Sequence, residues 1–182
     1  MRWFVIIAVV VSLMAYGVYY FATGDQRAID ANAGPKEQQL TITLGRNEQL
    51  QDLIAAGTYG RVDSPILHAT LPPGSANGAK IELTLLKLHY DFHSKEEALA
   101  ALQAKGLVPA RIEHMLALGA EYPDFHVFNQ GSLIFLGTTL KDSQNEDSVP
   151  ALSTNEPHEL RLYHVADPLL IGPNDWIAGM KK

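Results

Sequence analysis

The chain has 182 residues, enough for one sizeable domain and a short additional segment but hardly for two domains. It carries 14 Lys and Arg against 20 Asp and Glu, and this net charge of −6 argues against nucleic acid as a partner, because nucleic acid is held by concentrated positive charge. There is no cysteine, which excludes a disulfide framework and a thiolate metal site.

The N-terminal segment from Trp3 to Ala22 contains no charged side chain. A helix of that length would span ~30 Å, the thickness of a bilayer core, so the pattern predicts a single-pass anchor that binds the lipid bilayer through residues 3–22. Arg2 predicts a cytoplasmic N-terminus and a body outside the cytoplasm. The alternative is a cleaved signal peptide, for which Ala31-Asn32-Ala33 is the small-residue site.

This interpretation divides the chain into an anchor over residues 1–23, a flexible linker over 24–38 and one domain over 39–182. Within the domain, Leu40–Leu44 alternates apolar and polar residues and predicts a strand with one buried face. A helix capped by Asn47 and ended by Gly57 follows, and then a one-turn helix begins at Asp63-Ser64-Pro65.

The stretch from Lys80 to Gly119 organises the domain. Its strand, Ile81–Tyr90, carries apolar residues first on one face and then on the other. Two explanations remain open at this stage: a bulge resets the register, or the strand is central and covered on both sides.

Two helices follow this strand. Ser94 and Glu97 form a capping-box pattern that predicts a helix over Ser94–Lys105. Pro109 separates it from a second helix, Arg111–Leu118, because proline disfavours helical geometry in the residue before it.

After Pro123 the pattern changes to strands and loops. Strands are predicted at Leu133–Leu136, Leu160–Val165 and Trp176–Met180, with Lys141–Ser148 as an exposed polar loop. The expected fold class is therefore α+β: an N-terminal transmembrane helix followed by one small domain with two to four helices and a mainly antiparallel sheet.

The strongest candidate for chemistry is the group His89, Asp91 and His93. Two histidines four residues apart with an acid between them suggest a metal or hydrolase-type site, but they fall at a strand end and lack a helical His-Glu-x-x-His context. Two surface histidines are the simpler interpretation.

A catalytic triad of Ser132, His126 and Asp124 has no supporting sequence motif. No catalytic, cofactor-binding or metal residue is therefore assigned, and no cofactor is expected.

The motif Gly106-Leu107-Val108-Pro109-Ala110, followed by the helix Glu113–Gly119 and by Tyr122-Pro123, resembles a group of small, uncharacterised bacterial membrane-anchored domains. The chain is also distantly similar to the C-type-lectin-like and formylglycine-generating-enzyme-like fold. The resemblance implies a fold and no activity, because the cysteines and calcium-binding motif of those proteins have no counterpart here.

The sequence thus predicts a non-catalytic binding or structural domain, presented outside the cytoplasm, whose partner is a protein or an envelope glycan. The alternative is a histidine-dependent enzyme with its site near His89, Asp91 and His93.

Overall fold

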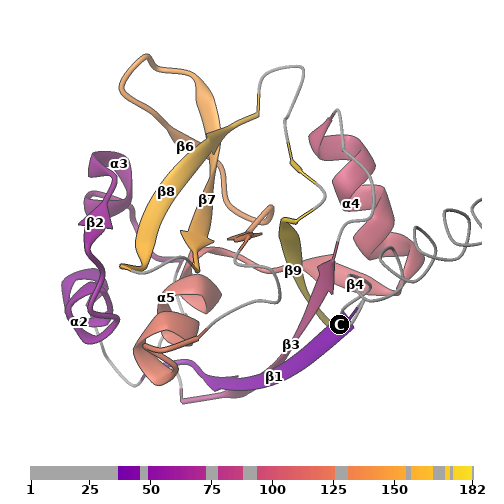
Figure 1. Ribbon diagram of the computed structural model, residues 1–182, viewed down its shortest axis with the longest axis horizontal. Coiled ribbons are helices and arrows are strands. Elements are labelled where there is room, and N and C mark those ends of the chain that lie inside the picture. The colour runs from indigo at the N-terminus through magenta and orange to yellow at the C-terminus, as the bar shows by residue number, and fades with distance from the viewer. Residues whose placement is uncertain are drawn as a thin grey trace, which may run out of the picture. The chain divides into compact units, whose positions relative to one another are not determined.

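A computed structural model of the protein describes residues 37–45, 49–72, 78–87, 94–125, 131–154, 157–165, 171–172 and 174–181. These parts form a nine-stranded sheet and four helices (Figure 1). The strands are β1 Glu37–Thr43, β2 Arg61–Val62, β3 Lys80–Lys87, β4 Leu107–Pro109, β5 Ser132–Ile134, β6 Leu140–Lys141, β7 Asp147–Ser153, β8 Glu159–His164 and β9 Trp176–Lys181. The helices are α2 Leu50–Ala56, α3 Ser64–Leu67, α4 Lys95–Ala104 and α5 Ile112–Glu121.

The sheet has the strand order β1-β3-β9-β5-β7-β8-β2, with β4 paired to β9 and β6 paired to β7. β5 runs parallel to β9 and β2 runs parallel to β8, while the other neighbours are antiparallel. The sheet is therefore mixed and large. This corrects the predicted fold class, which paired a transmembrane helix with a small, mainly antiparallel domain.

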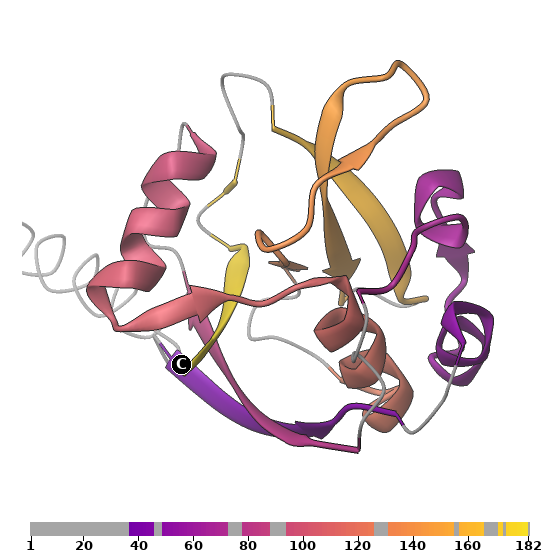
Figure 2. The ribbon, with the colours of Figure 1, turned by 180° about the vertical axis from the view of Figure 1, so that it is seen from behind.

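Helices cover both faces of the sheet, as Figures 1 and 2 show from opposite sides. On one face, the strand residues Leu85 and Trp176 are buried in a core with α5. On the other face, Leu86 and Ile177 are buried in a second core with α4. β3 lies between β1 and β9 and pairs with both in continuous register. Its apolar side chains therefore lie on both faces because the strand is central and covered on both sides, and no bulge is needed to explain them.

The predicted helices form close to their expected positions because the residues that cap and start them are neighbours in the sequence. The Ser94 hydroxyl accepts a hydrogen bond from the Glu97 N–H at 3.2 Å and so caps α4. α2 begins at a different cap from the one predicted: Gln49 is its N-cap, while Asn47 lies outside the described residues. Proline starts α3 at its first turn, as expected.

No helix in the described ranges is long and apolar enough to cross a membrane. The longest, α4 and α5, have 10 residues each and would span only about 15 Å, half of a bilayer core. The predictions of a single-pass membrane protein with a signal anchor and an extracytoplasmic body are therefore not supported and are corrected here. The segment Trp3–Ala22, on which they depended, lies outside the described residues.

The prediction that Lys141–Ser148 is an exposed loop is correct for residues 142–146, which form a largely exposed turn, and wrong for the ends of the segment, which belong to β6 and β7. This segment is the β6–β7 hairpin, and β7 continues through Pro150 to Ser153. Pro150 is tolerated because its missing N–H faces β5 just beyond the end of that strand, while its carbonyl accepts from the Phe135 N–H at 2.9 Å.

Candidate metal centre

The tip of the β6–β7 hairpin is a three-residue turn between Asp142 and Glu146. The Asp142 carbonyl accepts from the Asn145 N–H at 3.1 Å, and the Asp142 N–H donates to the Glu146 carbonyl at 3.0 Å. Asn145 closes the turn with a φ of 64°, in the left-handed region that asparagine tolerates well. The turn therefore sets Asp142 and Glu146 opposite each other.

The strand register places a third ligand beside this pair. Cross-strand partners share one face of a sheet, and so do residues two apart along a strand. Asp142 pairs with Glu146, Ser148 follows Glu146 by two residues, and Ser148 pairs with His164 on β8. All four side chains consequently lie on the same face, whereas Lys141 and Asp147 lie on the opposite one.

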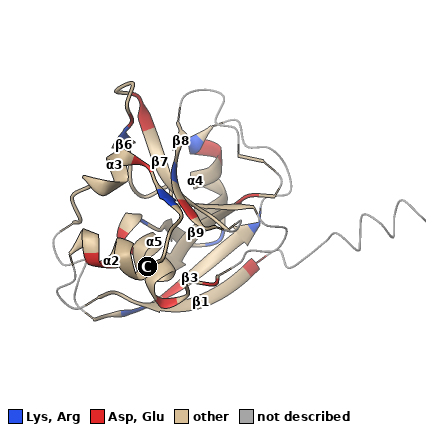
Figure 3. Ribbon diagram, turned by 60° about the vertical axis from the view of Figure 1, so that its left-hand side comes forward, with Lys and Arg blue, Asp and Glu red and all other residues tan. Residues whose placement is uncertain are grey.

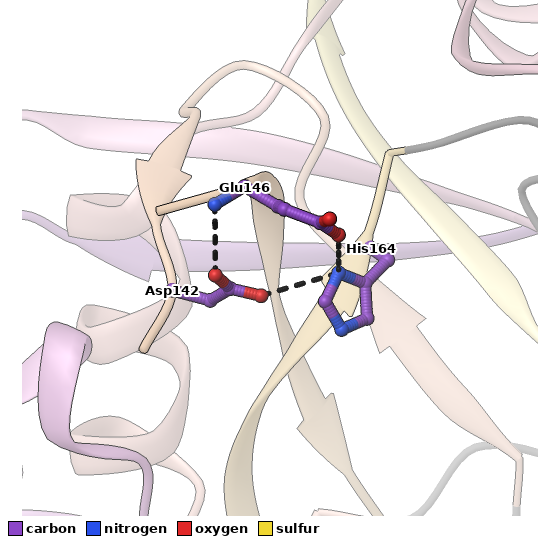
Figure 4. Close-up of side chains that lie close together, drawn as sticks. All are labelled: Asp142, Glu146 and His164. Atoms are coloured by element: carbon purple, nitrogen blue, oxygen red, sulfur yellow. Dashed lines mark hydrogen bonds and ion pairs between the residues drawn. The ribbon is translucent and has the colours of Figure 1, made fainter. Parts of the chain in front are cut away.

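His164 faces both carboxylates (Figure 4). Its Nδ1 lies 3.2 Å from Asp142 Oδ2 and 3.4 Å from Glu146 Oε2. One ligand atom from each of the three residues lies within 4.8 Å of the others. The Asp142 side chain is 10% exposed, whereas those of His164 and Glu146 are 53% and 55% exposed.

Asp142 is held as a carboxylate. Its Oδ1 accepts from the Glu146 N–H at 2.9 Å and from the Gln144 N–H at 2.8 Å. These bonds, the one from Glu146 foremost, lower the pKa of Asp142 below its ordinary value, and the nearby His164 and Lys141 act in the same direction. Oδ1 is thus occupied by the turn, and Oδ2 is left to face the imidazole.

The separations fit a tetrahedral metal site. Zinc binds imidazole nitrogen and carboxylate oxygen at about 2.0–2.2 Å, so two ligand atoms of a tetrahedral site lie about 3.3 Å apart. The two distances from His164 Nδ1, 3.2 and 3.4 Å, match this value. The two carboxylate oxygens lie within 4.8 Å of each other, and the exposed Glu146 side chain can adjust to a metal ion.

A buried hydroxyl adjoins this cluster. Ser148 is 0% exposed, and its Oγ has no hydrogen-bond partner within the described ranges. The Val165 N–H donates to the Asp147 carbonyl, so Ser148 and His164 form the closer, non-hydrogen-bonded kind of pair. Ser148 therefore lies close to His164 on the same face of the sheet.

The hairpin cluster contains none of the residues singled out from the sequence. His89, Asp91, His93 and His126 lie outside the described residues. The Ser132 hydroxyl is occupied, because it accepts from the Tyr163 hydroxyl at 2.8 Å. Asp142, Glu146 and His164 were missed because their proximity depends on a hairpin that the sequence analysis treated as a loop. The turn-forming run Ser143-Gln144-Asn145 between two acids was the signal that could have found them.

A second group of ionisable side chains, two of them buried, lies at the start of α5. The Glu113 side chain is 1% exposed, and its Oε1 lies 2.5 Å from Arg111 Nε. His114 Nδ1 accepts from the Arg111 backbone N–H at 3.0 Å. Burial lowers the pKa of His114, against the opposing effect of the Glu113 charge. The Glu113 and His114 side chains are enclosed by the core, whereas the Arg111 side chain is 44% exposed. The hydrogen bond from the Arg111 N–H to His114 orders the N-terminus of α5.

Charge on the rest of the described surface is dispersed, with Lys and Arg interspersed among Asp and Glu (Figure 3). No protein-family model matches the chain, and no curated protein or solved structure matches it either. The case for function therefore depends on the geometry of the hairpin cluster.

Proposed function

We propose that this protein is a non-catalytic binding domain that holds a divalent cation, zinc by preference, through Asp142, Glu146 and His164. The observation that carries the proposal is the placement of one imidazole nitrogen 3.2 and 3.4 Å from two carboxylate oxygens. A nitrogen ligand with only two carboxylates favours zinc over calcium, which takes six to eight oxygen ligands.

The exposure of the cluster supports binding rather than catalysis. His164 and Glu146 are each more than half exposed, so water reaches the site freely. A catalytic metal site also needs a shaped cavity around the metal, and ligands that lie more than half exposed at a hairpin and a strand end do not form one. Three protein ligands leave a fourth position open, which an oxygen atom from water or from a partner protein or glycan can take.

The experiment is a zinc titration of the full chain against a chromophoric chelator, with His164→Gln and Asp142→Asn as test variants. Asp142→Asn keeps a side-chain oxygen for the turn and removes the ligand charge. Asp147→Asn is the matched control, because Asp147 lies on the same hairpin but on the opposite face, where it pairs with Lys141 at 2.8 Å. We expect one zinc ion per chain, bound about tenfold or more weakly by each test variant and unchanged in the control.

A His89→Ala/His93→Ala variant separates this proposal from the alternative site. Unchanged zinc affinity in this variant, together with loss in His164→Gln, supports the hairpin cluster. Zinc binding that is lost in the His89/His93 variant and kept in His164→Gln would overturn the proposal, as would the absence of stoichiometric zinc in the parent protein.

The alternative explanation of the cluster is a polar contact between His164 and the two carboxylates that holds no metal. Protons compete with zinc for nitrogen and oxygen ligands, so the measured zinc affinity should fall as the pH is lowered. A cluster that serves only as a polar contact would show no zinc binding at any pH.

A further inference from the structure

β1 is an edge strand, and its hydrogen-bonding pattern is fixed by one contact. The Leu44 N–H donates to the Ala79 carbonyl at 2.9 Å, in the register that pairs Thr43 with Lys80. Hydrogen-bonded pairs alternate along an antiparallel ladder, so the even-numbered residues of β1 bond to β3. The backbone groups of Glu37, Gln39 and the following odd-numbered residues therefore point away from the sheet.

The C-terminal half of this outer edge is covered by the end of α5. Glu121 Oε2 accepts from the Thr43 N–H at 2.7 Å, and the Tyr122 hydroxyl donates to the Thr41 carbonyl at 2.9 Å. These contacts occupy backbone groups that would otherwise accept another strand, which is how natural proteins protect an edge.

The N-terminal half is not covered in this way. Within the described part of the chain, no hydrogen bond reaches the outward N–H and C=O groups of Glu37 and Gln39, and both residues are exposed. Tyr122, the one large apolar side chain classed as exposed among the described residues, lies beside this open stretch. Exposed tyrosines are enriched in protein interfaces.

The outward backbone groups of Glu37 and Gln39 in one copy of the chain can form hydrogen bonds with the same groups in a second copy. They comprise two donors and two acceptors, and a two-fold axis through Gln38 would pair Glu37 of each chain with Gln39 of the other through four backbone hydrogen bonds. This register places each Glu37 carboxylate opposite an amide rather than opposite its own copy. Within one chain the same two side chains already bond, with Gln39 Nε2 donating to Glu37 Oε1 at 3.3 Å.

We propose that the N-terminal half of β1 is a homodimer interface, in which two copies of the chain pair β1 antiparallel about Gln38. Because β1 is the end of the strand order and the other end is the two-residue β2, pairing through β1 gives a closed dimer rather than a fibre. The interface lies at the opposite end of the domain from the β6–β7 hairpin (Figures 1 and 2), so it is independent of the metal proposal.

The first test uses the absence of cysteine from the native chain. In the proposed register the two Gln38 Cα atoms lie about 4.5 Å apart, which is within the range of a disulfide. Full-length Gln38→Cys should therefore form a disulfide-linked dimer under mild oxidation. In the matched control Thr41→Cys, the two cysteines would lie about 20 Å apart and should remain free. Equal cross-linking of both variants, or none in Gln38→Cys, would refute this register.

The second test measures association itself by sedimentation velocity over a concentration series. Gln39→Pro removes an outward N–H from each chain while leaving the bonds to β3 intact, since proline is tolerated on an edge strand. We expect Gln39→Pro to weaken dimerisation by about tenfold or more, whereas Gln39→Thr, which keeps the N–H, should dimerise like the parent. A monomeric parent, or equal association of both variants, would overturn the proposal, provided that their melting curves show both to be folded.

Discussion

Tyr59 lies against two glycines, and this contact allows a quantitative test of the packing. A Cβ atom added at Gly119 on α5 would lie 1.8 Å from the Tyr59 hydroxyl oxygen and 2.7 Å from its Cζ. A Cβ added at Gly57 would lie 2.3 Å from the same ring. The Tyr59 hydroxyl is buried without a hydrogen-bond partner in the described part of the chain, and burial raises the pKa of Tyr59 above its ordinary value.

Two opposite effects follow for single substitutions. Tyr59→Phe removes an unsatisfied buried hydroxyl, so we expect it to stabilise the protein by about 1 kcal/mol. Gly119→Ala introduces an overlap that costs about 1–3 kcal/mol, offset by about 1 kcal/mol of improved helix propensity. The net result for Gly119→Ala is a destabilisation of about 0–2 kcal/mol.

The double variant is the decisive measurement. Without the hydroxyl the closest overlap is gone and the contacts with Cζ at 2.7 Å and Cε1 at 3.2 Å remain, so alanine at position 119 should cost less in the Tyr59→Phe background. We expect a coupling free energy of about 1 kcal/mol between the two sites in a double-mutant cycle measured by urea unfolding. Additive effects within about 0.3 kcal/mol, or a destabilising Tyr59→Phe, would refute this account of the packing.

Three further outcomes are expected. Ser94→Ala should destabilise the protein by about 1 kcal/mol in urea unfolding because it removes the bond to the Glu97 N–H, and Ser94→Asp, which keeps an acceptor, should not. His114 has a pKa below 6.5 in the folded state, so its contribution to stability is complete above pH 6.5 and is lost as the pH falls; melting temperatures should therefore fall less steeply with acidification in His114→Asn than in the parent. Gly131→Ala would bring a Cβ to 1.8 Å from the backbone oxygen of Asn174, so a loss of more than about 2 kcal/mol is expected, and a melting temperature equal to that of the parent would contradict it.

The sequence predicted those elements whose signals are local. The α4 cap lies within four residues, and the one-turn helix α3 is specified by its own Asp-Ser-Pro start. β7 was missed because Pro150 breaks the strand pattern, and its tolerance depends on where β5 ends, which is not a local property.

The candidate metal centre was missed for a related reason. Asp142 and Glu146 are close in sequence, but their side chains meet only because a tight turn reverses the chain between them. His164 comes from β8, and only the pairing of Ser148 with His164 brings it to the same face. A single sequence carries no direct signal for this strand register, so a scattered histidine could not be distinguished from a ligand.

The central place of β9 has a consequence for biosynthesis. β9 bonds to β3, β4 and β5, which come from three separate parts of the chain, yet it is synthesised after all three of them. Until it emerges, β1 and β3 have no bond to β5 and β7, and both halves expose unpaired edges to other nascent chains. A product truncated before Trp176 should therefore aggregate or be degraded, and its yield in cells should depend strongly on chaperones.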